Sequence, residues 1–154
     1  MGLFPFFKKK PFFSAEENEK IVHSIQEAEK QTSGEIRFFA EGHCKYVDAL
    51  DRAKEIFTNL QMEKTELRNA VLFYVAIKDK QLAIFADEGI HKAAGGDRYW
   101  KNTVKEILSV FSKDSVVAGI TTTIYKIGEA LKTHFPYDKD VDKNELPDEI
   151  IFGK

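Results

Sequence analysis

The sequence predicts an α/β fold: a three-layer α/β/α sandwich in which about four helices cover a small mixed β-sheet. The apolar run Ala70–Ile77 is typical of a central strand that is buried on both faces. Strand, helix and strand patterns follow one another over residues 35–77, and such a βαβ unit is parallel and right-handed. The short polar turn at 78–80 then leads into a further strand, which should return antiparallel.

The first half of the domain shows the pattern helix, strand, helix. The first helix begins after Ser14, because its hydroxyl and the carboxylate of Glu17 can form a capping box. This helix extends to about Gln31 and is ended by the Thr-Ser-Gly sequence at 32–34. Residues 35–40 (EIRFFA) then predict a strand, and apolar residues at helical spacing predict a second helix from about 47 to 61.

The second half continues with the strands at 70–77 and 81–86. Residues 87–99 are polar and contain three glycines, so we predict a loop there. Apolar residues from Trp100 to Phe111 mark a third helix. Asp114 or Ser115 can cap a fourth helix, whose apolar stripe extends to Leu131.

The two ends of the chain differ from the domain, which we place at residues 14–135. Residues 1–13 are rich in Phe and Lys, and we expect their phenylalanines to pack onto the domain. The alternative is a weak contact with an anionic membrane surface or with a protein. Residues 136–154 are acidic and predict an extended tail. Its apolar residues can dock it: Leu146, Ile150, Ile151 and Phe152.

Composition excludes several classes of protein. The net charge of −2 argues against a nucleic-acid partner, since such domains usually carry a large basic excess. The single cysteine, Cys44, excludes an internal disulfide and a multi-cysteine zinc site. The longest apolar run is far shorter than the roughly 20 residues that span a bilayer. With neither a transmembrane segment nor a signal sequence, we expect a cytoplasmic location.

Short motifs along the chain resemble those of the TPM domain, a family named for thylakoid, bacterial and nematode members. The resemblance covers residues 14–135, and the order and spacing of the motifs carry it. They are Ser33–Arg37 (SGEIR), Arg68–Leu72 (RNAVL), Asp87–Ile90 (DEGI), Tyr99-Trp100 and Gly119-Ile120. In addition, Asn144–Ile150 (NELPDEI) is similar to the tail of a soluble bacterial subgroup.

The resemblance implies an α/β/α sandwich. Several TPM domains bind calcium or other divalent cations, and a plant member is described as an acid phosphatase. Most bacterial members have no settled function. Many carry a signal peptide and a transmembrane helix, which this sequence does not show.

Polar side chains are expected to meet at one edge of the sheet, where the first and second strands start and the third ends. Thr65, Asn69, Asp87, Glu88 and Asp97 are predicted to gather at this edge, which we call the rim. Carboxylate, amide and hydroxyl oxygens are the ligands of hard cations, so the rim predicts a site for Ca²⁺, with Mg²⁺ possible. The alternative is that the aspartates cap helices or are solvated loop charges, and that Arg68 pairs with a glutamate such as Glu66.

A second hypothesis uses the same rim for metal-dependent phosphatase activity. Arg68 would bind phosphate, and His91 or Glu88 would carry the proton. The sequence has no Walker loop and no GxSxG elbow, so the metal would have to activate a water molecule. A third hypothesis is an interaction module that docks a membrane or a partner through residues 1–13 or through the tail.

Two further segments carry potential metal ligands. The tail at 138–149 has acidic residues at EF-hand spacing, but Lys143 stands where the turn needs glycine, so a solvated acidic tail is favoured. His43 and Cys44 follow the first strand at the opposite edge. Two adjacent ligands make at most half of a metal site, and a partly buried thiol is the simpler interpretation.

Overall fold

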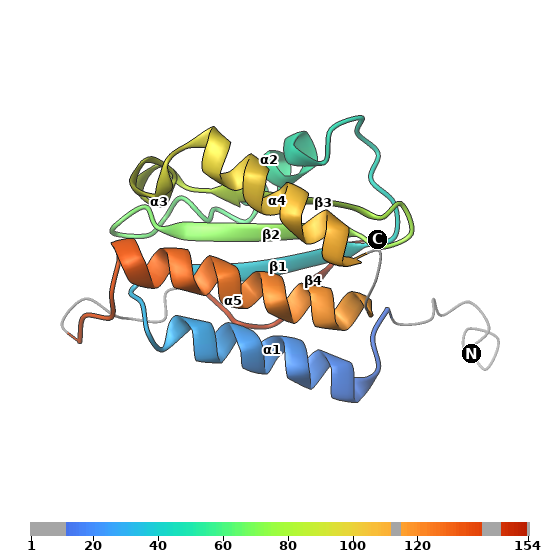
Figure 1. Ribbon diagram of the computed structural model, residues 1–154, viewed down its shortest axis with the longest axis horizontal. Coiled ribbons are helices and arrows are strands. Elements are labelled where there is room, and N and C mark those ends of the chain that lie inside the picture. Colours follow the sequence, from blue (N-terminus) through green and yellow to red (C-terminus); the bar gives the residue numbers. More distant parts are fainter. Residues whose placement is uncertain (1–11, 112–114, 140–145, 154) are drawn as a thin grey trace.

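The computed structural model describes residues 12–111, 115–139 and 146–153, which form a sheet between two helical layers (Figure 1). The helices of this part of the chain are α1 (Ala15–Glu29), α2 (Ala49–Asn59), α3 (Glu88–Ala94), α4 (Asp97–Phe111) and α5 (Val116–His134). The strands are β1 (Glu35–Glu41), β2 (Ala70–Ala76), β3 (Gln81–Ala86) and β4 (Ile151–Phe152). The predicted α/β sandwich is therefore confirmed.

The sheet is mixed, with the strand order β3-β2-β1-β4. Strands β1 and β2 are parallel, with Glu35 opposite Ala70, and α2 is the crossover helix between them. Strand β3 returns antiparallel to β2, as the polar turn predicted. All seven residues of β2 are buried, because helices cover both faces of the sheet at this position.

Two apolar cores lie on the two faces of the sheet. Helices α1, α4 and α5 cover one face, where Ile21, Ile107 and Ile124 share one apolar core with residues of β1, β2 and β3. Helix α2 covers the other face, where Ile56 packs beside Tyr74. The capping box of α1 is present, with the Glu17 amide donating to Ser14 Oγ (3.1 Å) and the Ser14 amide donating to Glu17 Oε1 (2.8 Å).

The expected loop at 87–99 is wrong, because this segment contains α3 and the start of α4. Asp87 caps α3, since its carboxylate accepts a hydrogen bond from the Glu88 amide (2.8 Å). Gly95 and Gly96 have φ values of +115° and +75°, a conformation that ends α3 at little cost for glycine. The glycine pair therefore separates two helices instead of forming part of a long loop.

The C-terminal segment adds the fourth strand. Ile151 lies opposite Phe39, so β4 extends the sheet in parallel beside β1. Leu146 and Ile151 pack on the α2 side of the sheet, and Ile150 packs on the opposite core. Phe152 contacts the rings of Phe12 and Phe13, at centroid distances of 6.2 Å each. Residues 1–11 lie outside the described part of the chain.

A cluster of three acidic side chains, of which Glu35 is buried and Glu29 and Asp148 are half-buried, joins the C-terminal segment to α1 and β1. Glu29 Oε2 accepts a hydrogen bond from the Ile36 amide (2.8 Å), and the Glu29 side chain also bonds to those of Asp148 and Glu35. Burial, followed by the bond to Asp148, raises the pKa of Glu29 far above its ordinary value. This raised pKa favours the protonated form of Glu29, which can donate a hydrogen bond to a neighbouring carboxylate.

This cluster predicts a specific dependence of stability on pH. A raised pKa in the folded state means that the contribution of Glu29 is present at low pH and is lost as pH rises above its ordinary value of 4.5. The free energy of unfolding should fall by up to about 1.4 kcal/mol per pH unit from this group. Glu29→Gln, which stays neutral, should remove that slope in urea unfolding measured from acid to alkaline pH.

The matched control is Glu19→Gln, an exposed position on the same helix. It should keep the slope of the natural protein. Identical slopes in the two variants would show that Glu29 is ionised in the folded protein.

Candidate functional site

The rim is built by the turn before β2, the start of β1 and the start of α3. The turn at 65–69 precedes β2, and Arg68 adopts a φ of +53° within it. The Glu35 amide donates to the carbonyl oxygen of Asn69 (3.3 Å), which brings the start of β1 to this turn. The Gly89 amide donates to the carbonyl oxygen of Arg68 (2.9 Å), which brings the start of α3 to it. A Cβ at Gly89 would lie 2.4 Å from the carbonyl oxygen of Leu67, so this close approach needs glycine.

An ion pair occupies the centre of the rim. Arg68 Nε donates to Asp87 Oδ2 (2.7 Å) and Arg68 Nη2 donates to Asp87 Oδ1 (2.8 Å), so the pair is bidentate. A third nitrogen, Nη1, lies 3.2 Å from Glu88 Oε1. The hydrogen bond to Asp87 raises the pKa of Arg68. Arg68 therefore pairs with Asp87 and Glu88. The alternative to a metal site, in which Arg68 pairs with a glutamate, thus has its counterpart in Glu88 and not in Glu66.

Two buried side-chain oxygens in the turn at 65–69, which also carries Arg68, have no partner among the described residues. Asn69 is 1% exposed, and its Nδ2 donates to Ser33 Oγ (3.4 Å), while its Oδ1 accepts no hydrogen bond. Thr65 is 6% exposed, and its Oγ1 is likewise without a partner. Buried polar atoms are normally satisfied, so such atoms require an explanation.

An open hollow of about 540 Å³ lies at the same edge of the sheet. Ser33 and Leu67 line it on one side. The segment that follows α5 lines the other side with His134 and residues 135–139. His134 could not be placed at the rim from the sequence, because nothing in its local pattern indicates that the chain beyond α5 returns to the start of β1.

The predicted ligands are only partly brought together. Thr65, Asn69 and Asp87 are buried at the rim, whereas the side chain of Glu88 is 70% exposed. Asp97 is 77% exposed, lies 3.3 Å from His91 Nε2, and lines a different hollow beside β3. Within the described ranges, no group of three or more His, Cys, Asp and Glu side chains is arranged to hold a metal ion. Of the EF-like tail, residues 140–145 lie outside the described chain.

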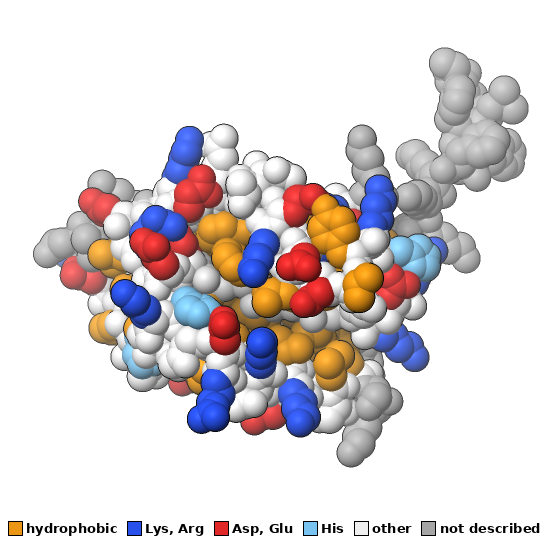
Figure 2. Space-filling view, turned by 90° about the horizontal axis from the view of Figure 1, so that it is seen from above, with side chains coloured by type: hydrophobic (Ala, Val, Ile, Leu, Met, Phe, Trp, Pro, Cys, Tyr) orange, Lys and Arg blue, Asp and Glu red, His pale blue; other side chains and the backbone are white. Residues whose placement is uncertain are grey.

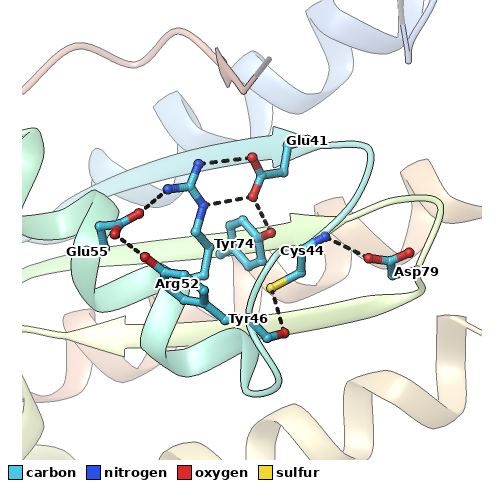
Figure 3. A network of polar contacts seen from close by, with 7 residues as sticks. All are labelled: Glu41, Cys44, Tyr46, Arg52, Glu55, Tyr74 and Asp79. Carbon is cyan, nitrogen blue, oxygen red and sulfur yellow. Dashed lines mark hydrogen bonds and ion pairs between the residues drawn. The ribbon is translucent and has the colours of Figure 1, made fainter.

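At the opposite ends of the parallel strands, the carboxylate of Asp79 holds both His43 and Cys44. Figure 3 shows its contact with Cys44. His43 Nδ1 lies 2.7 Å from Asp79 Oδ1, and the Cys44 amide donates to Asp79 Oδ2 (2.6 Å). The thiol of Cys44 is half-buried and points to the carbonyl oxygen of Tyr46 (3.5 Å). This geometry is that of a loop closed by Asp79.

A larger ion-pair network beside this loop attaches α2 to the sheet (Figure 3). Arg52 Nε donates to Glu41 Oε2 (2.9 Å), and its Nη2 donates to Oε1 (3.0 Å). Arg52 also bonds to Glu55, which in turn accepts from the hydroxyl of Tyr46, and Tyr74 donates to Glu41. This network was not predicted from the sequence. The available signal was the charged residue Glu41 at the end of an apolar strand.

The electrostatics of this network indicate a structural role. Burial alone would raise the pKa of Glu41, but hydrogen bonds from Arg52 and Tyr74 outweigh it and the pKa is lowered. Burial and the bond to Glu41 raise the pKa of Tyr74, so its hydroxyl remains a donor. Every charge in the network therefore has a partner, and the network stabilises the fold.

The protein is thus an α/β/α sandwich with a polar rim where its parallel strands β1 and β2 begin. The sequence model of the TPM domain matches residues 7–130. This chain therefore belongs to the TPM domain family, in agreement with the motifs in its sequence.

Two solved structures are similar to this chain. The BA42 protein from the psychrophilic bacterium Bizionia argentinensis is 41% identical, with a TM-score of 0.83, over 96% of this chain and 99% of BA42. The N-terminal domain of the cg2496 protein from Corynebacterium glutamicum is 11% identical, with a TM-score of 0.59, over 80% of this chain and 85% of that domain. The second likeness shows the fold alone. No curated protein sequence matches this chain significantly.

Across the described residues, no helix has both the length and the apolar character needed to cross a membrane.

The Arg52 network predicts a large loss of stability when the arginine is removed. Arg52→Ala leaves Glu41, whose side chain is 6% exposed, as a buried charge without its ion-pair partner. The free energy of unfolding in urea should fall by about 3–5 kcal/mol. Lys54→Ala, on the exposed face of the same helix, should change it by less than about 0.5 kcal/mol.

A double variant separates charge from packing. Adding Glu41→Gln to Arg52→Ala removes the unpaired charge and should recover part of the loss. No recovery would mean that the arginine acts mainly through its packing over the Phe39 ring, whose centroid lies 5.6 Å from it.

Proposed function

We propose that this TPM-domain protein binds a divalent cation, Ca²⁺ or Mg²⁺, at the rim through Asp87, Asn69 and Thr65. The observation that supports the proposal is the pair of buried oxygens, Asn69 Oδ1 and Thr65 Oγ1, without a partner among the described residues and in the turn next to a buried carboxylate. A cation would satisfy both atoms.

The chemistry of this donor set suits a hard cation. Ca²⁺ takes six to eight oxygen ligands from carboxylates, amides, hydroxyls and water. Asp87 supplies the charge, and Asn69 and Thr65 supply neutral oxygens. The neighbouring hollow leaves room for water molecules or for an anionic ligand to complete the coordination.

Arg68 acts as the competitor of the cation in this proposal. Its guanidinium bonds to both oxygens of Asp87, so the cation and the arginine must share or exchange this carboxylate. Arg68 already contacts Glu88, whose exposed carboxylate offers an alternative partner. The exchange favours modest affinity and couples cation binding to the start of α3.

No observation favours phosphatase activity over cation binding. The Arg68 donors are directed at Asp87 and Glu88, which leaves them engaged and not free for phosphate. His91 lies beside Asp97 at the hollow along β3, away from the hollow at the rim. We therefore restrict the proposal to cation binding.

A two-dimensional amide NMR titration of chelator-treated protein with Ca²⁺, then Mg²⁺, tests the proposal. We expect saturable shifts at residues 65–69 and 87–89. Asp87→Asn should weaken binding about tenfold or more, because it removes the only charged ligand of the set. Arg68→Gln should tighten binding by about tenfold, because it removes the competing positive charge.

The control is Asp51→Asn, which makes the same charge change on the exposed surface of α2. Its affinity should equal that of the natural protein, and the spectrum of each variant reports whether the fold is retained. Shifts confined to the tail, or no shifts at millimolar cation, would contradict the proposal.

A further inference from the structure

Strand β3 forms one edge of the sheet. Its register with β2 determines which of its backbone N–H and C=O groups point away from the sheet. The Asp87 amide donates to the carbonyl oxygen of Ala70 (2.9 Å), which fixes the phase of the β2–β3 ladder. In an antiparallel ladder, hydrogen-bonded and non-hydrogen-bonded pairs alternate. Three residues therefore point their N–H and C=O groups away from β2: Leu82, Ile84 and Ala86.

The residues that carry these outward groups are buried, and the groups themselves have no hydrogen-bond partner among the described residues. Leu82 is 7% exposed, Ile84 is 3% exposed and Ala86 is 5% exposed. Within residues 12–111, 115–139 and 146–153, no hydrogen bond reaches their outward N–H and C=O groups. Backbone groups in buried segments are normally paired, so this row of donors and acceptors calls for a partner.

The row forms the floor of a groove of about 350 Å³ between two helices. Leu50 and Lys54 of α2 line one wall, and Trp100, Lys101 and Val104 of α4 line the other. Figure 2 looks onto this edge from above, and apolar side chains are visible along a hollow bordered by charged side chains. The indole Nε1 of Trp100 is also buried without a hydrogen-bond partner among the described residues.

The acidic side chains that line the groove have partners, whereas its two lysines form no ion pair with any described residue. Asp48 accepts a hydrogen bond from the Leu50 amide (2.9 Å), and Asp97 lies 3.3 Å from His91 Nε2. Lys54 and Lys101, in contrast, form no ion pair with any described residue. One lysine stands in each wall, so the groove offers two free positive charges to an occupant.

We propose that this groove binds an extended peptide segment of a partner protein, which adds a strand to β3 and places an acidic side chain between Lys54 and Lys101. The free backbone row recognises the main chain of an extended peptide, as in other cases of β-strand addition. The apolar walls take the side chains next to the acidic residue. The groove is separate from the rim, so this inference does not depend on cation binding.

A capped pentapeptide of sequence threonine-valine-glutamate-valine-threonine is the probe. In an amide NMR titration at millimolar peptide, we expect saturable downfield shifts at Leu82, Ile84 and Ala86, because their N–H groups gain acceptors. The same peptide methylated on its backbone nitrogens should not bind, since it can no longer donate. Lys54→Glu/Lys101→Glu should weaken binding by about two- to fivefold for each charge and should prefer a peptide with lysine in place of glutamate.

Lys132→Glu is the control, because it makes the same charge change on the exposed surface of α5. Unchanged amides at all three positions, or equal binding by the methylated peptide, would overturn the proposal. Shifts of these amides that depend on protein concentration without peptide, together with a dimeric mass, would assign the edge to a second copy of the chain and also overturn it.

Discussion

The fold depends on the burial of charges along one face of β1. Glu35, Arg37 and Glu41 alternate with apolar residues along this strand, yet all seven residues of β1 are buried. Such charges require partners, because an unpaired buried ion costs several kcal/mol. Arg52 of α2 neutralises Glu41, while Glu29 and Asp148 gather around the other end of the strand. Helix α2 and the C-terminal segment are thus held against the sheet by charge as well as by apolar contact.

The two edges of the sheet illustrate how similar side chains serve different roles. At the carboxyl ends of β1 and β2, an arginine bridges two glutamates, and two tyrosine hydroxyls complete the bonding. At the rim, Arg68 also bridges two carboxylates, but the oxygens of Asn69 and Thr65 stay without partners among the described residues. A network in which every polar group has a partner makes the surrounding structure rigid. A network with unpartnered oxygens can still bind a ligand through them. The two ends of the sheet therefore differ in their neutral side chains: the tyrosine hydroxyls are hydrogen-bonded, whereas the oxygens of Asn69 and Thr65 are not.

Much of the architecture could be predicted because its signals are local. The apolar run at 70–77, the capping box at Ser14 and the polar turn at 78–80 each specify one element, and the parallel crossover then brings the turn at 65–69 to the start of β1. Helix α3 could not be predicted, since two turns closed by Gly95 and Gly96 have the composition of a loop. The pairing of Arg68 with Asp87, and that of Arg52 with Glu41, depend on distances between segments that no local pattern encodes.

The attachment of the last strand has a consequence for folding kinetics. The bond from Thr32 Oγ1 to the carbonyl oxygen of Phe135 joins positions 103 apart, and β4 pairs with β1 over a still longer stretch of chain. The entropy of closing such loops must be lost before their contacts stabilise the chain. We therefore expect the contacts of β4 with β1 to form later than the local helices. Until those contacts form, the outer edge of β1 stays open, which makes the partly folded chain more prone to aggregate than the native one.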